Sequence, residues 1–235
     1  MSDATFAGKL ALVTGASKGI GAATATALAA KGAHVILTAR NNKGLEAVEQ
    51  QIHEVGGAAT IAPLDLTDGE SIGRLAAAIG ERWDALDILV LNAAMLGSLG
   101  PVSAIDSAEF NKILTLNLLS QQAMIAAFDA MLRKSQSGSV VAITSSVATN
   151  PRAFWGAYGA SKAALENIVL SYGDEVKNLS PLKVAIVDPV RTRTDMRAKA
   201  YPGEDPNTLK EPSVVGEAIC DLLATDFKTG HKLTL

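Results

Sequence analysis

Short apolar runs alternate along this chain with longer, alanine-rich stretches whose apolar residues recur at helical spacing. Each run is nearly continuous in apolar residues, as in parallel strands that are covered on both faces. The pattern predicts strands at residues 10–13, 34–38, 59–64, 88–91, 140–144 and 184–187, with a last one near the end of the chain. It predicts helices near residues 20–31, 43–55, 68–82, 106–133, 156–178 and 212–224.

The repeated alternation of strand and helix is typical of an α/β fold. It predicts a Rossmann-type doubly wound parallel sheet of about seven strands, with helices on both faces. No linker, repeat or low-complexity tract divides the 235 residues, so we expect a single domain over residues 1–235. Ligands of such sheets bind beyond the carboxyl ends of the strands, and residues there are the first candidates for a functional site.

Composition narrows the possible functions. Hydrophobic residues make up 48% of the chain and the net charge is −3, which favours a globular protein and argues against nucleic-acid binding. Residues 1–6 lack a basic start followed by an apolar core, and no apolar run approaches the length of a membrane span, so we expect a cytoplasmic protein without a membrane partner. Cys220 is the single cysteine, so the chain has no CxxC motif of the kind that binds metals or carries out redox chemistry, and no metal is expected.

A glycine-rich turn follows the first expected strand and opens the first expected helix. Its glycines allow a tight turn, let the backbone approach a pyrophosphate, and direct the helix N-terminus at the negative charge. A turn without a ligand is the alternative, but the position between strand and helix favours a dinucleotide site. The turn reads Thr14-Gly15-Ala16-Ser17-Lys18-Gly19-Ile20-Gly21.

Tyr158 and Lys162 lie four residues apart in an expected helix, so their side chains share one face. A free tyrosine has a pKa of about 10 and a lysine one of about 10.4, and a positive neighbour favours the phenolate. The two groups can therefore form an acid/base pair. Taken alone, the spacing is common in helices, and a solvated lysine beside a half-buried tyrosine is the simpler interpretation.

The spacing GxxxGxG, combined with Tyr158-x-x-x-Lys162, resembles the short-chain dehydrogenase/reductase family along almost the whole chain. The resemblance implies hydride transfer between a nicotinamide cofactor and a small-molecule carbonyl or secondary alcohol. The catalytic residues that it implies are Asn117, Ser145, Tyr158 and Lys162. The cofactor contacts that it implies are Gly15, Ser17, Lys18, Gly19, Ile20, Gly21, Arg40, Asp65, Leu66, Asn92, Ala93, Tyr158, Lys162, Pro189, Thr192 and Thr194.

Each implied catalytic residue has a physical role. Tyr158 would exchange the proton of the substrate oxygen, which Ser145 would hold by a hydrogen bond. Lys162 would lower the pKa of the phenol and reach the ribose hydroxyls. By the same resemblance, Asn117 would hold a water that connects Lys162 to solvent.

The residues after the second expected strand bear on cofactor choice. An NAD site usually places a carboxylate there for the ribose hydroxyls, whereas an NADP site offers positive charge to a 2′-phosphate. Here Arg40 offers a bidentate phosphate partner, no carboxylate is present, and Lys18 brings a second positive charge. The sequence therefore favours NADP(H) over NAD(H).

Two positions depart from the family pattern. Ala94 and Val190 replace glycines, and a valine adopts positive φ only at a cost, so the loop after Pro189 is expected to take another path. These changes leave open a second function, a catalytically weak cofactor-binding sensor of the same fold. An epimerase or dehydratase of nucleotide sugars would need a larger C-terminal region, and an enoyl reductase a wider Tyr to Lys spacing.

Residues 191–212, rich in proline and charge, are expected to form a lid over the site. Residues after the strand ends or in this lid would line a mainly apolar substrate pocket, namely Met95, Leu96, Leu99, Pro151, Phe154, Trp155, Met196 and Tyr201. The sequence does not identify the substrate. The helices that carry Asn117 and Tyr158 are apolar on more than one face, and a second apolar face must be covered by something. The family resemblance implies that these two helices pair between subunits, so we expect a homodimer or homotetramer.

Overall fold

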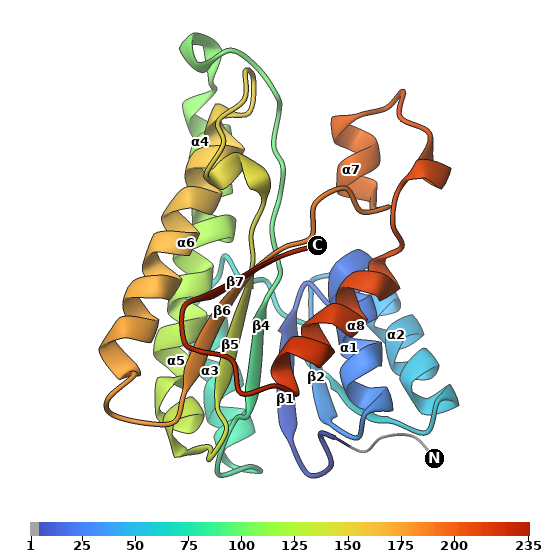
Figure 1. Ribbon diagram of the computed structural model, residues 1–235, viewed down its shortest axis with the longest axis vertical. Coiled ribbons are helices and arrows are strands. Elements are labelled where there is room, and N and C mark those ends of the chain that lie inside the picture. The colour runs from blue at the N-terminus through green and yellow to red at the C-terminus, as the bar shows by residue number, and fades with distance from the viewer. Residues whose placement is uncertain (1–4) are drawn as a thin grey trace.

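A seven-stranded sheet forms the centre of the computed structural model, which describes residues 5–235. All strands are parallel and lie in the order β3-β2-β1-β4-β5-β6-β7 (Figure 1), which confirms the doubly wound sheet. Residues 1–4, part of the N-terminal segment on which the expected cytoplasmic location rests, lie outside the described residues. The strands are β1 (Leu10–Thr14), β2 (His34–Thr38), β3 (Ala58–Ile61), β4 (Ile88–Leu91), β5 (Ser139–Ile143), β6 (Lys183–Asp188) and β7 (His231–Thr234).

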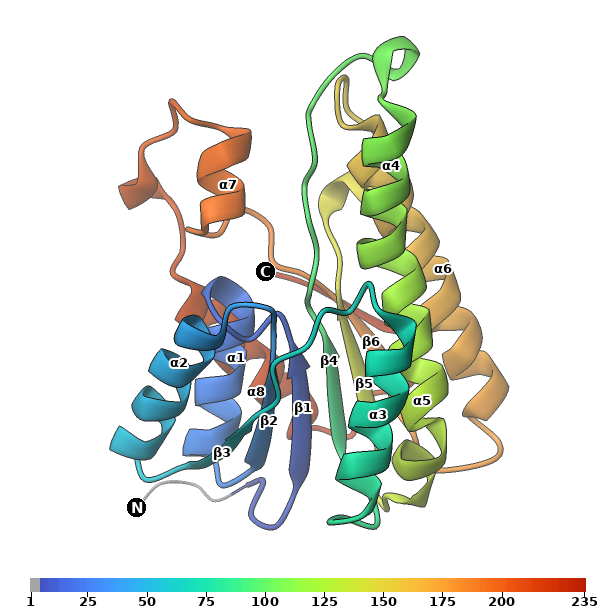
Figure 2. The same ribbon diagram turned by 180° about the vertical axis from the view of Figure 1, so that it is seen from behind.

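Helices cover both faces of the sheet (Figures 1 and 2). Alternate strand residues point to opposite faces, so Leu12 and Leu89 lie in one core cluster and Val13 and Val90 in the other. One face carries α1 (Gly19–Ala30), α2 (Asn42–Glu54) and α8 (Pro212–Leu223). The other carries α3 (Gly69–Gly80), α5 (Ser120–Lys134) and α6 (Gly156–Val176), and α4 (Ser107–Leu114) lies beyond the carboxyl edge of the sheet (Figures 1 and 2).

The single helix expected at residues 106–133 is interrupted. A π turn, η2 (Thr115–Leu119), separates α4 from α5. Asn117 lies in this turn, and its side chain bonds the backbone of Met95 rather than its own helix. π turns of this kind are rare and open the regular hydrogen-bond ladder of a helix, often at functional sites.

The third strand is shorter than expected, because β3 ends at Ile61 instead of residue 64. Pro63 has no backbone N–H, but it falls between Ala62 and Leu64, whose N–H groups donate to β2, so it removes no hydrogen bond of this ladder. The chain stays beside β2, since Leu64 N donates to Ala39 O at 3.1 Å. This path brings Asp65 to the carboxyl end of the sheet.

Between β6 and α8 the chain makes an excursion beyond the carboxyl edge of the sheet (Figure 1). The excursion contains α7 (Asp195–Ala200) and the short η4 (Pro206–Thr208). Thr192 forms a parallel bridge with Lys210, and Arg193 N donates to Lys210 O at 2.8 Å, which closes its neck. Two further short turns, η1 (Val102–Ala104) and η3 (Ser146–Ala148), lie near the same edge.

Residues 5–235 contain neither a candidate membrane span nor a candidate metal site. None of the helices there combines the length and the apolar character that crossing a membrane requires. No group of three or more His, Cys, Asp or Glu side chains in that range is arranged to hold a metal ion.

Candidate active site

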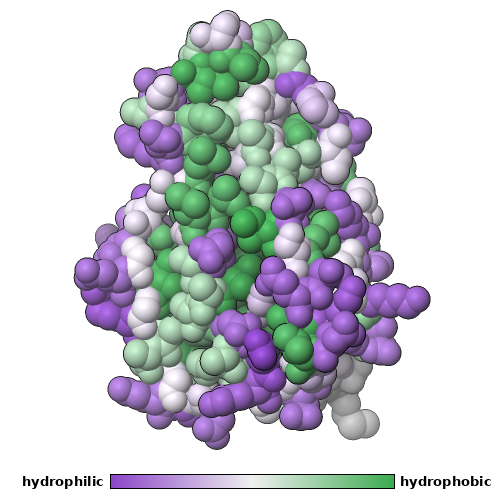
Figure 3. Space-filling view, turned by 90° about the vertical axis from the view of Figure 1, so that its left-hand side faces the viewer, coloured by the Kyte–Doolittle hydropathy of each residue, from purple (hydrophilic) through white to green (hydrophobic). Residues whose placement is uncertain are grey.

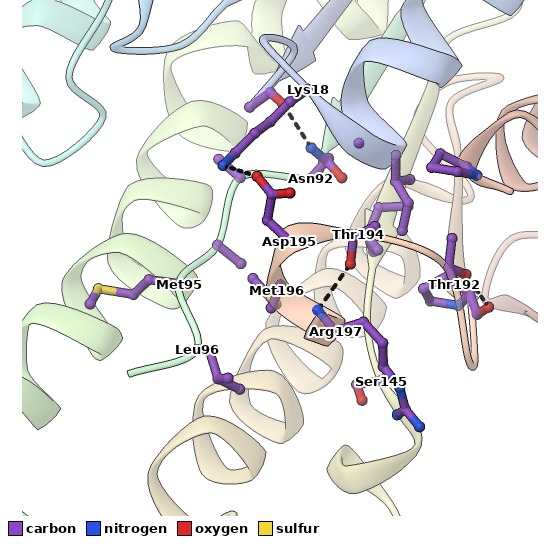
Figure 4. Close-up of a pocket in the computed structure, with 18 of the residues that line it drawn as sticks. Lys18, Asn92, Met95, Leu96, Ser145, Thr192, Thr194, Asp195, Met196 and Arg197 are labelled. Carbon is purple, nitrogen blue, oxygen red and sulfur yellow. Dashed lines mark hydrogen bonds and ion pairs between the residues drawn. The ribbon is translucent and has the colours of Figure 1, made fainter. Parts of the chain in front are cut away.

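A cavity of about 850 Å³ lies at the carboxyl edge of the sheet, between the strand ends and α7 (Figure 4). It brings together residues from both ends of the sequence, so most of the predicted site converges in one place. Among the predicted catalytic and cofactor-binding residues, Gly21 and Asn117 do not line the cavity. Those that do are Gly15, Ser17, Lys18, Gly19, Ile20, Arg40, Asp65, Leu66, Asn92, Ala93, Ser145, Tyr158, Lys162, Pro189, Thr192 and Thr194.

The glycine-rich turn leaves the start of α1 open toward the cavity. Gly15 has a φ of +65°, and a Cβ on Gly21 would collide with the Asn92 amide and the Gly15 carbonyl, so both positions require glycine. Lys18 precedes α1 and provides no side-chain cap, whereas α2, α3, α4 and α7 are capped by Asn41, Asp68, Asp106 and Thr194. The unpaired N–H groups of α1 are therefore available to an anion.

Asn92 holds the glycine-rich turn in place. Its amide donates to Thr14 O at 2.9 Å and to Gly15 O at 3.3 Å. The Thr14 hydroxyl in turn accepts hydrogen bonds from Asn92 N and Ala93 N at 2.9 and 3.0 Å. These bonds fix the ends of β1 and β4 side by side, at the point where the strand order reverses.

Arg40 and Asp65 form the far rim of the cavity, beyond β2 and β3. Hydrogen bonds from the backbone and hydroxyl of Thr67 lower the pKa of Asp65, and the charge of Arg40 contributes in the same direction. The rim therefore holds a fixed carboxylate beside an exposed guanidinium.

Lys18 lies in the glycine-rich turn, as predicted, but its ammonium is paired across the cleft. Lys18 Nζ lies 2.6 Å from Asp195 Oδ2, at the first residue of α7 (Figure 4). Both side chains are largely exposed, so the pair contributes little to stability. It nevertheless connects the turn to the excursion after β6.

Ser145, Tyr158 and Lys162 line the inner end of the cavity. Ser145 follows β5 and precedes η3 without capping it. Lys162 is 2% exposed, and Lys162 Nζ donates to Ile143 O at 2.7 Å. Burial lowers the pKa of Lys162 to about 8, although the charge of Glu166 opposes this shift.

The expectation that Lys162 lowers the pKa of the phenol is wrong for this structure. Burial raises the pKa of Tyr158, and the carboxylate of Asp188 raises it further. The ammonium of Lys162 lies 5.9 Å from the centroid of the Tyr158 ring and donates a hydrogen bond to Ile143 O. It therefore does not offset the rise in the pKa of Tyr158. The phenol is accordingly protonated at neutral pH.

Asn117 lies behind the cavity wall rather than in it. Asn117 Oδ1 accepts from Met95 N at 2.8 Å, and Asn117 Nδ2 donates to Met95 O at 2.9 Å and to Ser161 Oγ at 3.0 Å. Ser161 Oγ donates to Tyr158 O at 2.7 Å. The amide therefore connects the segment after β4 to the first turns of α6.

The loop after β6 keeps the backbone expected for a glycine, contrary to the prediction of another path. Val190 has a φ of +54°, and within residues 5–235 only one other non-glycine residue, Phe154, has a positive φ. Ala94 lines the cavity with a negative φ, so that position does not need a glycine. Strained residues of this kind concentrate at functional sites.

Val190→Gly is expected to raise the free energy of unfolding by about 1 kcal/mol. A β-branched residue in the left-handed region costs roughly 1–3 kcal/mol, and the greater freedom of glycine in the unfolded chain offsets part of the gain. Urea denaturation measures the change. Val102→Gly, at an exposed position with negative φ, is the control and should give no gain. Equal effects of the two substitutions would contradict the assignment of strain.

The cavity wall beside Tyr158 is apolar. Tyr158 packs in one cluster with Leu96, Val147, Trp155 and Met196. Three of the arginines that flank the cleft are engaged in ion pairs: Arg191 and Arg197 with Glu204, and Arg193 with Glu211. Of the expected pocket residues, Met95, Leu96, Trp155 and Met196 line the cavity, whereas Leu99, Pro151, Phe154 and Tyr201 do not.

Sequence reasoning missed a charged group behind the catalytic pair, consisting of Glu166, Asp188 and Lys232. Glu166 Oε1 accepts from Thr144 Oγ1 at 2.6 Å, and Glu166 Oε2 from Lys232 Nζ at 2.7 Å. Asp188 lines the cavity, and burial together with Glu166 raises its pKa. The one available signal was spacing, because Glu166 is four residues after Lys162 in a helix.

A family model for short chain dehydrogenases matches residues 9–205. The chain therefore belongs to the short-chain dehydrogenase/reductase family, as its motifs indicated, and is an oxidoreductase that acts on CH–OH groups with a nicotinamide dinucleotide as acceptor. It is similar to the uncharacterised oxidoreductase YciK of Escherichia coli, with 37% identity over 227 residues that cover 94% of this chain and 89% of that protein.

Two solved structures of short-chain dehydrogenases are also similar, each with a TM-score of 0.94 and 36% identity. One, from Shigella flexneri, is complexed with NADP and is matched over 100% of this chain and 99% of its own. The other, from Escherichia coli, is complexed with NADPH and is matched over 100% and 98%. Both relatives share the fold throughout.

Proposed function

We propose that this protein is an NADP(H)-dependent oxidoreductase that interconverts a carbonyl and a secondary alcohol, with Tyr158 as general acid/base. The observation that carries the proposal is that Ser145, Tyr158 and Lys162 line the same cavity as the uncapped N-terminus of α1. An anion-binding helix end and a proton donor at opposite parts of one cavity suit a dinucleotide whose reactive ring faces a substrate oxygen.

The cofactor, when bound, supplies or accepts the hydride. The residues of this chain manage the oxygen and its proton. Tyr158, protonated because burial and Asp188 raise its pKa, donates to the oxygen that gains charge during reduction. Ser145 holds that oxygen by a hydrogen bond, and the buried Lys162 reaches the ribose hydroxyls and supplies positive charge near the phenolate that remains.

Asn117 has a positioning role in this proposal. Both ends of its amide are bonded, to Met95 and Ser161, so it holds the segment after β4 and the start of α6 together. The π turn that contains it opens the helix ladder next to Lys162, where a water of a proton relay can bond the backbone.

The preference for NADP(H) rests on Arg40. Its guanidinium is exposed at the cavity rim after β2, where the cofactor ribose would lie, and the residues that follow β2 there include no carboxylate. Similar proteins complexed with NADP and NADPH support this choice. Lys18 would add positive charge only after it exchanges Asp195 for a phosphate.

Residues 191–212 act as a lid in this proposal. Their neck is closed by the bridge between Thr192 and Lys210, and Arg197 binds Glu204 through two nitrogens at 2.5 and 2.7 Å, so the excursion can move as one unit. Its contact with the glycine-rich turn, through Lys18 and Asp195, is exposed and readily exchanged with water. Together with residues 1–190 and the rest of the chain, the lid would belong to one dinucleotide-binding domain.

The test of the function is a panel of carbonyl compounds assayed by the absorbance of NADPH, with apolar ketones and aldehydes first because the wall beside Tyr158 is apolar. Turnover that depends on Tyr158 would support the proposal. Cofactor binding without turnover of any compound would favour a sensor of the same fold instead.

We also propose a homodimer or homotetramer formed through α5 and α6. Figure 3 looks onto the side of α4, α5 and α6 and shows an apolar band flanked by hydrophilic residues. Ile168 on α6 and Leu119 next to α5 are 36% and 57% exposed, although Met124, Phe128 and Tyr172, which prompted the prediction, are buried in the core of their own chain. An exposed apolar helix face of this extent is typical of an interface.

Sedimentation at micromolar concentration is expected to show a dimer or tetramer. Ile168→Glu would place a charge in the proposed interface and should shift the population to smaller species. Val55→Glu, at an exposed valine beyond the end of α2, should leave the sedimentation coefficient unchanged. A wild-type protein that sediments as a monomer would refute the assembly.

A further inference from the structure

Lys162 is an ammonium that is almost completely buried. It is 2% exposed, and its nitrogen donates to one backbone carbonyl, that of Ile143. No carboxylate in residues 5–235 lies within 4.0 Å of this nitrogen. A buried ammonium with so little compensation is costly, and the neutral amine is favoured unless a counter-charge lies nearby.

Glu166 is the carboxylate closest along the helix, one turn after Lys162 on the same face of α6. It is buried, and both of its oxygens are held, by Thr144 Oγ1 at 2.6 Å and by Lys232 Nζ at 2.7 Å. Thr144 directly precedes Ser145 at the end of β5, and Lys232 belongs to β7. Glu166 thus connects the helix that carries Tyr158 and Lys162 to the strand end that carries Ser145.

The charged and titratable groups around Lys162 come from three elements. Tyr158 and Glu166 lie on α6, Asp188 ends β6, and Lys232 lies on β7. The neighbouring β5 end and π turn contribute uncharged groups, the Ile143 carbonyl, the Thr144 hydroxyl and the Asn117 amide. Lys210 and Arg152 act on Asp188 from outside this group. Among these groups, Glu166 raises the pKa of Lys162 against the effect of burial.

We propose that Glu166, held by Thr144 and Lys232, is a positioning residue that keeps Lys162 in its charged form and fixes α6 against the strand end bearing Ser145. The effect of Glu166 on catalysis rests on the proposed function. The effect of Glu166 on the charge of Lys162 does not rest on it, because that effect can be measured without a substrate.

The first test is the pH dependence of kcat/KM for NADPH-dependent reduction. Loss of the Lys162 proton lowers the rate on the alkaline side, so Glu166→Gln is expected to move that limb to lower pH by about one pH unit. Lys232→Met removes a positive charge but keeps the carboxylate of Glu166, so it should move the limb to higher pH. Glu175→Gln, an exposed position of the same helix, should leave it unchanged.

The second test measures the charge of Lys162 through stability, and it needs no turnover. The pKa of Lys162 is about 8 in the fold and ~10.4 in the unfolded chain, so the unfolded chain binds more protons between these values. The free energy of unfolding attributable to Lys162 therefore rises as pH increases above about 8. Subtracting the free energies of unfolding of Lys162→Met, measured over the same pH range, isolates this contribution. In the Glu166→Gln background the rise should begin about one pH unit lower.

Opposite shifts for Glu166→Gln and Lys232→Met, in either test, support the proposal. A uniform loss of rate at all pH values, or shifts of the same sign in both variants, would show that Glu166 is only structural and would overturn it. If Glu166→Gln does not fold, Lys232→Met, at a half-exposed position, tests the proposal alone: a shift to higher pH supports it and a shift to lower pH overturns it. If no carbonyl compound is reduced, the proposed function fails while the stability series still tests Glu166.

Discussion

Tyr158→Phe is expected to lower kcat/KM for carbonyl reduction by about 10²- to 10⁴-fold, the range that general acid catalysis contributes. The substitution removes one hydroxyl and keeps the ring, which packs edge-on against Trp155 at a centroid distance of 6.0 Å. The loss should appear in kcat, because the hydroxyl donates to the oxygen as charge develops on it. NADPH affinity, measured by fluorescence titration, should change by no more than a small factor.

Tyr172→Phe provides a matched control for this experiment. Tyr172 lies on the same helix and donates to Asp129 Oδ1 at 2.8 Å, away from the cavity. Its loss should affect stability and leave kcat largely intact. Activity of Tyr158→Phe close to that of Tyr172→Phe would remove Tyr158 from the mechanism.

Arg40→Asp is expected to reverse the cofactor preference. Losing a charge-assisted bond to the 2′-phosphate costs about 1.5–3 kcal/mol, or roughly 10- to 100-fold, and the new carboxylate can bond the two ribose hydroxyls of NAD(H). The ratio of kcat/KM for NADPH to that for NADH should therefore fall by about 100-fold or more.

The control for Arg40→Asp is Lys43→Asp, which makes the same change of charge three residues later without touching the cavity. It should alter the ratio only slightly, and more weakly as salt increases. A wild-type preference for NADH, or an equal effect of the two substitutions, would refute the assignment of Arg40.

The sheet and the composition of the cavity could be predicted because they depend on local pattern. Strands buried on both faces have continuous apolar runs, and the residues after them meet at one edge of a parallel sheet. Gly15, after β1, and Arg40, after β2, could therefore be placed at that edge, whereas Tyr158, on a helix, was assigned to the same site by the family resemblance.

The errors lie where the structure depends on contacts between distant residues. Helical periodicity does not reveal the π turn, because the partner of the Asn117 side chain is the backbone of Met95, 22 residues earlier. The direction of the Tyr158 pKa follows from its burial and from Asp188, neither of which the spacing of Tyr158 and Lys162 contains. Lys18 was predicted to bring a second positive charge to the cofactor site, and only the folded chain shows Asp195 opposite it.

The uncapped start of α1 has a consequence for how long the protein persists in a cell. A ligand that binds these N–H groups binds the folded chain and not the unfolded one, so each increase in free cofactor above its dissociation constant adds to the free energy of unfolding. Proteases act on the fraction of molecules that is transiently open, and that fraction falls as the cofactor binds. The steady-state amount of this protein would therefore follow the cellular supply of its dinucleotide.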